Sequence, residues 1–85
     1  MTTLTLIGKP GCHLCDDARP VIEAVLAEFP SVRLEERSIL DDSTLAARYG
    51  EEIPVVLIDG RQHSYWHVDA AKLRAALAAA VAPKH

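Results

Sequence analysis

The sequence is poor in several features that would point to particular classes of protein. It has no apolar stretch of about 18 residues or more, which a membrane span needs. Its 9 lysines and arginines are outnumbered by 12 acidic residues, so it lacks the basic surface that follows a nucleic-acid backbone. Residues 1–8 carry no basic region followed by a cleavable apolar stretch, unlike a signal peptide. These absences predict a cytoplasmic protein that binds neither membranes nor nucleic acid.

Cysteines and aromatic residues are also scarce. The two cysteines, Cys12 and Cys15, lie in one short motif, whereas disulfide-stabilised secreted proteins spread more of them along the chain. With one tryptophan, one phenylalanine and two tyrosines, aliphatic side chains and alanines must fill the core. The hydrophobic content of 49% is sufficient for one core. We therefore expect a single domain over residues 1–85, and a monomer.

The pattern of apolar residues predicts seven secondary-structure elements. The predicted strands cover Thr3–Ile7, Val32–Ile39, Pro54–Ile58 and Arg61–Trp66, and the predicted helices cover His13–Phe29, a segment from Asp41 or Asp42 to Tyr49, and a segment from the Asp69 cap to Ala82. Asp59-Gly60 is a typical hairpin turn between the last two strands.

The predicted order is β-α-β-α-β-β-α. Because a helix joins the first two strands, these strands must be parallel, and the last two form an antiparallel hairpin. The strand at 32–39 is rich in charge, which predicts an edge position. The sequence thus predicts an α/β fold in which helices flank a four-stranded mixed sheet.

The motif Cys12-His13-Leu14-Cys15 lies where the first strand meets the first helix. In disulfide exchange the thiolate is the nucleophile, and a helix N-terminus favours negative charge. Cys12 is at that terminus and Cys15 is one turn further on. This spacing predicts that Cys12 attacks a disulfide and that Cys15 resolves the mixed disulfide.

A metal site is the alternative use of two close cysteines. A structural zinc ion needs four ligands, and His13, His63, His67 or His85 could complete the set. No second close pair of ligands exists, so we predict no metal site. The alternative function is a non-enzymatic module that binds a metal, an iron–sulfur centre or a protein partner.

Several motifs of the chain resemble the glutaredoxins of the thioredoxin-fold superfamily. Lys9 stands three residues before Cys12, where glutaredoxins have a lysine that meets the substrate carboxylate. Glu52-Ile53-Pro54 resembles their Thr-Val-Pro segment, whose proline is cis and faces the cysteines. The string Cys-His-Leu-Cys-Asp-Asp-Ala is similar to small bacterial glutaredoxin-like proteins with unassigned substrates.

The resemblance implies a thioredoxin-like fold of the glutaredoxin type. It also implies a thiol–disulfide oxidoreductase acting on protein or glutathione mixed disulfides, with glutathione as a co-substrate and no tightly bound cofactor. Two features depart from the family. His13 and Leu14 replace Pro-Tyr between the cysteines, and residues 65–68 replace a Gly-Gly pair that lets glutathione approach the backbone. We therefore expect weaker glutathione binding than in a typical glutaredoxin.

The predicted site combines these observations. The predicted catalytic residues are Cys12 and Cys15, and the predicted substrate-binding residues are Lys9, His13, Ile53, Pro54, Val68 and Asp69. A histidine at position 13 can donate a hydrogen bond to the sulfur of Cys12. The resemblance implies that the Ile53–Pro54 bond is cis, which would turn the Ile53 backbone toward Cys12, where it could pair with an incoming peptide or glutathione.

Overall fold

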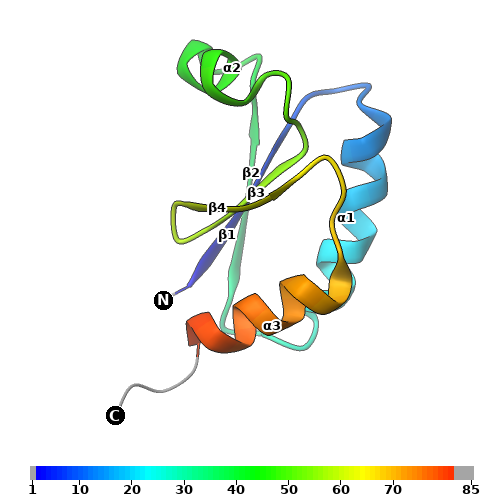
Figure 1. Ribbon diagram of the computed structural model, residues 1–85, viewed down its shortest axis with the longest axis vertical. Helices are drawn as coiled ribbons and strands as arrows, with labels where there is room; N and C mark the ends of the chain where they lie inside the picture. Colours follow the sequence, from blue (N-terminus) through cyan, green and yellow to red (C-terminus); the bar gives the residue numbers. More distant parts are fainter. Residues whose placement is uncertain (1, 82–85) are drawn as a thin grey trace.

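The computed structural model describes residues 2–81 and contains the seven predicted elements in the predicted order. The strands are β1 (Thr3–Gly8), β2 (Arg33–Ser38), β3 (Val55–Ile58) and β4 (Arg61–Tyr65), and the helices are α1 (His13–Leu26), α2 (Ser43–Tyr49) and α3 (Ala70–Val81) (Figure 1). The predicted helix end at Ala82 lies outside the described residues. None of the helices within residues 2–81 has the length and hydrophobicity needed to cross a membrane.

The four strands form one mixed sheet in the order β2-β1-β3-β4. Strand β1 is parallel to β2 and antiparallel to β3, and β3 and β4 form an antiparallel hairpin. The charged strand β2 lies at an edge, as its composition predicts. The architecture is therefore the predicted α/β fold, with helices flanking a four-stranded mixed sheet.

The hairpin between β3 and β4 turns at Asp59 and Gly60. Both residues have positive φ, 51° and 84°, which is the backbone of the tight turn that matches the twist of paired strands. Asp59 also joins the turn to the neighbouring strand, because its carboxylate accepts from the Thr3 amide at 2.9 Å. Further along, Val56 pairs with Ser64 and Leu57 with Gln62, which leaves one extra residue in β4 as a bulge.

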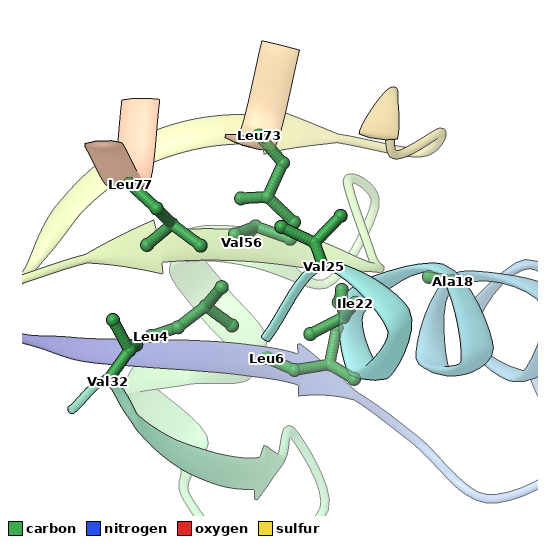
Figure 2. Packing of buried hydrophobic residues seen from close by; sticks show 9 residues of the cluster. All are labelled: Leu4, Leu6, Ala18, Ile22, Val25, Val32, Val56, Leu73 and Leu77. Carbon is green, nitrogen blue, oxygen red and sulfur yellow. The ribbon is translucent and has the colours of Figure 1, made fainter. Parts of the chain in front are cut away.

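Helices α1 and α3 pack together on one face of the sheet (Figure 1). Figure 2 shows the main core between them and the strands, formed by Leu4, Leu6, Ala18, Ile22, Val25, Val32, Val56, Leu73 and Leu77. The α1 members recur at the three- and four-residue spacing of one helix face. This core fixes α1 on the sheet and so positions the cysteine motif at its first turn.

A second, smaller cluster lies at the end of the sheet that carries the cysteine motif. It contains Ile7, Cys15, Tyr49, Ile53 and Val55. Successive strand side chains point to opposite faces, so Ile7 and Val55 leave the main core and meet this cluster instead. Helix α2 contributes Tyr49 to this cluster. The helix begins after Asp42, whose carboxylate caps it by accepting hydrogen bonds from two backbone amides.

Helix α1 ends at Leu26, three residues before the predicted end at Phe29. The last turn tightens, with the amides of Glu28 and Phe29 donating to carbonyls three residues back. Pro30 follows, and the residue before a proline is sterically disfavoured in a helix. Phe29 nevertheless packs against the main core, which explains why it fits the apolar pattern of the helix. Each strand also differs from its predicted range by one residue at one or both ends: β1 extends to Gly8, β2 lacks Val32 and Ile39, β3 lacks Pro54, and β4 lacks Trp66.

Candidate active site

Cys12 is the N-cap residue of α1. Its backbone is extended, with φ −85° and ψ 113°, and its sulfur accepts a hydrogen bond from the Cys15 amide at 3.2 Å. The first amides of a helix have no partner within the helix, so this sulfur takes the role that a serine or aspartate oxygen has at other helix starts. Cys12 is partly exposed and belongs to the rim of the smaller cluster.

Cys15 lies one turn further on and is buried, with 3% of its surface exposed. Burial, together with a hydrogen bond to the side chain of Cys12, raises the pKa of the Cys15 thiol to about 11. A hydrogen bond with the Lys9 backbone opposes this shift. In the reduced protein, Cys15 is therefore a protonated thiol at neutral pH.

Alkylation should distinguish the two thiols. With limiting iodoacetamide at neutral pH, we expect modification of Cys12 before Cys15, because only Cys12 is accessible and the Cys15 pKa is raised. Peptide mapping of the product measures the ratio. Unfolding the protein in urea before the reaction should remove the preference, and faster labelling of Cys15 in the folded protein would reverse the assignment.

The raised pKa of Cys15 also predicts a loss of stability in alkali. As the pH rises from 9 toward 11, the unfolded chain loses this thiol proton before the folded protein does, which favours unfolding. Stability from this group is complete below pH 9 and is lost through pH 11, by roughly 2–3 kcal/mol in all. Urea unfolding of the reduced protein across this range, compared with Cys15→Ala, measures the difference. Identical pH profiles would contradict it.

Gly8, at the end of β1, allows Cys15 to pack against the sheet. A Cβ atom at position 8 would lie 2.7 Å from the sulfur of Cys15 and 3.3 Å from its Cβ. No other side chain fits there while Cys15 stays in place. The sequence gives no signal for this role of Gly8, because the contact joins residues that no local pattern connects.

Gly8→Ala should therefore destabilise the reduced protein by about 1–3 kcal/mol, since the added methyl group overpacks the buried cysteine. Chemical unfolding measures the cost. In a Cys15→Ala background the sulfur is absent, so the same substitution should cost clearly less. An equal cost in both backgrounds would mean that the strain arises elsewhere.

The segment before β3 faces the cysteine motif. The Ile53–Pro54 peptide bond is cis, and both residues are buried. Ile53 belongs to the cluster that contains Cys15 and that Cys12 borders. The structure thus brings Cys12, Cys15 and Ile53 together around one cluster.

Trp66 holds this segment from the other side. Its backbone has φ 64°, in the region that favours glycine, and its amide donates to the Pro54 carbonyl at 2.9 Å. Its indole nitrogen donates to the Glu51 carbonyl at 3.0 Å. The sequence predicts Trp66 at the end of a strand and gives no signal for this role, because its partners are distant in the chain.

The other predicted substrate-binding residues lie around this centre. Lys9 and Cys15 line a cavity of about 440 Å³ beside β2, whereas Val68 lines a separate cavity beside α1. His13 is exposed at the start of α1. Asp69 caps α3, and its pKa is lowered because its carboxylate accepts from the Lys72 amide. The structure therefore does not bring Lys9 and Val68 into one cavity.

Potential metal ligands are dispersed within the described part of the chain. Residues 2–81 contain no group of three histidine, cysteine or acidic side chains that could hold a metal ion. His85, one of the histidines that could complete a site, lies outside these residues.

Comparison with known proteins identifies the family. The profile of the glutaredoxin-like domain (DUF836) matches residues 3–78. The chain belongs to this glutaredoxin-like family. An uncharacterized protein of Mycobacterium tuberculosis is 32% identical to this glutaredoxin-like chain over 77 residues, covering 86% of this chain and 79% of the relative.

Solved structures show the same fold. A structural-genomics target protein from X. campestris is 37% identical to this chain, with a TM-score of 0.67. The match covers 94% of this chain and 99% of the X. campestris chain. A mutant thioredoxin from Halobacterium salinarum has a TM-score of 0.73 at 21% identity, covering 99% of this chain and 78% of its own. The glutaredoxin-like chain therefore has a thioredoxin-superfamily fold with adjacent Cys12 and Cys15.

Proposed function

We propose that this protein is a thiol–disulfide oxidoreductase that reduces protein or glutathione mixed disulfides through Cys12 and Cys15. The observation that carries the proposal is the unequal pair of thiols at the start of α1. Cys12 is partly exposed and caps the helix, while Cys15 is buried one turn further along it. The backbone amide of Cys15 donates a hydrogen bond to the Cys12 sulfur. An attacking thiol and a resolving thiol need this difference in access.

The reaction follows in two exchanges. The Cys12 thiolate attacks one sulfur of a substrate disulfide, forming a mixed disulfide and releasing the other substrate sulfur as a thiolate, which takes up a proton. Cys15 then loses its proton and attacks Cys12, forming the Cys12–Cys15 disulfide and releasing the second substrate thiol. The substrate gains two electrons and two protons, and an external thiol reductant, itself oxidised to a disulfide, supplies two more electrons and protons that restore both cysteines to thiols.

The environment of Cys15 suits the second exchange. Part of the rise in its pKa comes from Cys12 through a hydrogen bond and charge, and that part ends once Cys12 is bonded to substrate. Burial persists, so Cys15 is inert toward other oxidants until the mixed disulfide forms beside it.

We assign substrate contacts to the residues around the cysteines. Ile53 would pair through its backbone with the substrate, and Pro54 fixes that segment. His13 and Lys9 would meet the substrate at the first turn of α1 and in the preceding loop, and Val68 and Asp69 would meet it before α3. Support comes from the shared cluster of Ile53 and the cysteines, and from the exposure of His13 and Lys9.

Glutathione is a weak co-substrate in this proposal. Trp66, not glycine, occupies the left-handed position before α3 and holds the Pro54 segment through its amide and indole. Loss of one charge-assisted contact lowers affinity by roughly 1.5–3 kcal/mol, or about tenfold to a hundredfold. A glutathionylated peptide should thus be reduced less efficiently than by an ordinary glutaredoxin assayed alongside, and equal kcat/KM would refute this point.

The proposed activity fits a monomer in a reducing compartment such as the cytoplasm, where both cysteines return to the thiol form. No tightly bound cofactor is required, because the thiols themselves carry the electrons.

The direct test is a single turnover. Fully reduced protein is mixed with an excess of a disulfide-linked peptide without other reductant, and the free peptide thiol and the protein mass are followed. We expect thiol release with formation of an internal disulfide, and Cys15→Ser should instead accumulate a mixed disulfide with the peptide. Release no faster than in a variant lacking both cysteines would refute the proposed function.

A further inference from the structure

We propose that the cavity between α1 and the segment 66–68 binds a lysine or arginine side chain next to the reactive cysteine of a protein substrate. The inference rests on the proposed function and adds its substrate class. The cavity has a volume of about 170 Å³. Pockets for whole small molecules typically have volumes of about 300–1,000 Å³. The smaller volume of this cavity therefore suits one long side chain.

The cavity lies next to the cysteine motif. It begins at Leu14, between the two cysteines, and continues along α1 past Asp17 and Val21. These positions are three and four residues apart and so share one face of the helix. The segment from β4 to α3 runs beside α1 and forms the opposite wall with Trp66 and Val68 (Figure 1).

The walls suit a side chain with an apolar stem and a cationic end. Leu14, Ala18, Val21 and Val68 provide apolar surface, and the exposed side chain of His67 also lines the cavity. Asp17 provides a carboxylate, which makes no ion pair with any residue from 2 to 81. Lysine and arginine place methylene groups on apolar surface while their charge meets an acid, so they complement both features.

The opposite wall is fixed before a substrate arrives. Trp66 is held to Pro54 and Glu51 by its amide and indole hydrogen bonds. Val68 packs against the main core. A preformed cavity of this kind loses little conformational entropy on binding, which favours recognition of a single side chain.

The distance from Cys12 is within reach of a bound peptide. Asp17 is five positions after Cys12, about 7.5 Å along the helix axis. An extended peptide advances about 3.3 Å per residue, so a long side chain one or two residues from the substrate cysteine can reach Asp17. Glutathione has two carboxylates and a net negative charge, and its one ammonium group lies next to a carboxylate and not at the end of a long apolar stem.

The neighbouring acid provides a matched control. Asp16 has the same charge and lies in the same turn, but it pairs with Arg19 at 3.8 Å and lines the other cavity, beside β2. Asp16→Asn and Asp17→Asn therefore change the net charge equally, and only Asp17→Asn changes the proposed subsite. Both side chains are exposed, so both variants should fold.

The experiment measures single-turnover rates with short peptides of the type Gly-Xaa-Cys-Gly and Gly-Cys-Xaa-Gly. Each cysteine is linked to thionitrobenzoate, the better leaving thiol, so that attack by Cys12 leaves the peptide on the protein and releases a coloured product. Xaa is lysine, norleucine, glutamate or glycine. For the wild type at low salt, we expect lysine to exceed glutamate by about three- to tenfold, with the ratio falling as salt increases.

The variants decide the assignment. Asp17→Asn should bring the lysine-to-glutamate ratio close to one, while Asp16→Asn should keep it. Equal rates for all peptides in the wild type, a preference for norleucine over lysine, or loss of the preference in Asp16→Asn alone would each overturn the subsite and leave the proposed function intact. Release no faster than in a variant lacking both cysteines would instead refute the proposed function, and the subsite with it.

Discussion

Replacing Cys12 with serine is expected to abolish disulfide reduction, lowering single-turnover release of peptide thiol by more than about a thousandfold. A serine hydroxyl cannot form the mixed disulfide, and the buried thiol of Cys15 cannot reach an external disulfide. The measurement is thiol release from a disulfide-linked peptide by reduced protein, compared with the wild type.

Unfolding can be separated from this chemical effect. Serine is a preferred N-cap residue, and its oxygen can accept the Cys15 amide as the Cys12 sulfur does. Cys12→Ser should therefore unfold at a temperature close to that of the reduced wild type. If the variant folds and still reduces the peptide through Cys15, the assignment of nucleophile and resolving thiol is wrong.

The largest expected effect on stability comes from Ile22→Ala. Ile22 has 0% exposure and lies at the centre of the main core between α1, α3 and the sheet (Figure 2). Truncation should cost about 2–5 kcal/mol, a large share of the roughly 5–15 kcal/mol that stabilises a domain. For a domain of this size the midpoint of thermal unfolding should fall by roughly 8–40 °C.

Two further substitutions calibrate this result. Ile22→Val removes one methylene group and should cost about 0.5–1.5 kcal/mol. Glu23→Ala changes the next residue, which is exposed, and should stay within about 0.5 kcal/mol of the wild type. Equal effects of Ile22→Ala and Glu23→Ala would show that the main core does not determine stability.

Most of the fold could be predicted because its signals are local. The apolar run Val55–Ile58 indicates a strand that is covered on both faces, and the three- and four-residue spacing of α1 indicates which face of the helix is buried. The Asp59-Gly60 turn is encoded in two adjacent residues. The predicted end of α1 at Phe29 is wrong because two neighbouring residues give conflicting signals. Phe29 continues the apolar pattern of the helix, whereas Pro30 disfavours a helical conformation at the residue before it.

The features of the site that depend on local sequence were also predictable, and those that depend on distant contacts were not. The difference in exposure between Cys12 and Cys15 follows from the start of one helix, so spacing alone predicts it. The contact between Gly8 and Cys15 and the hydrogen bonds of Trp66 to the Pro54 segment join distant positions, so no local pattern encodes them. The separate locations of Lys9 and Val68 likewise depend on how the helices pack on the sheet.

The central position of β1 has a consequence for folding. Because β1 lies between β2 and β3, its first residues pair with Arg33 on one side and Ile58 on the other. During synthesis β1 leaves the ribosome before β3, so its pairing with β3 waits until that strand has followed. Contacts between such distant positions slow folding. Until they form, the apolar residues of β1 are exposed to aggregation and to chaperones.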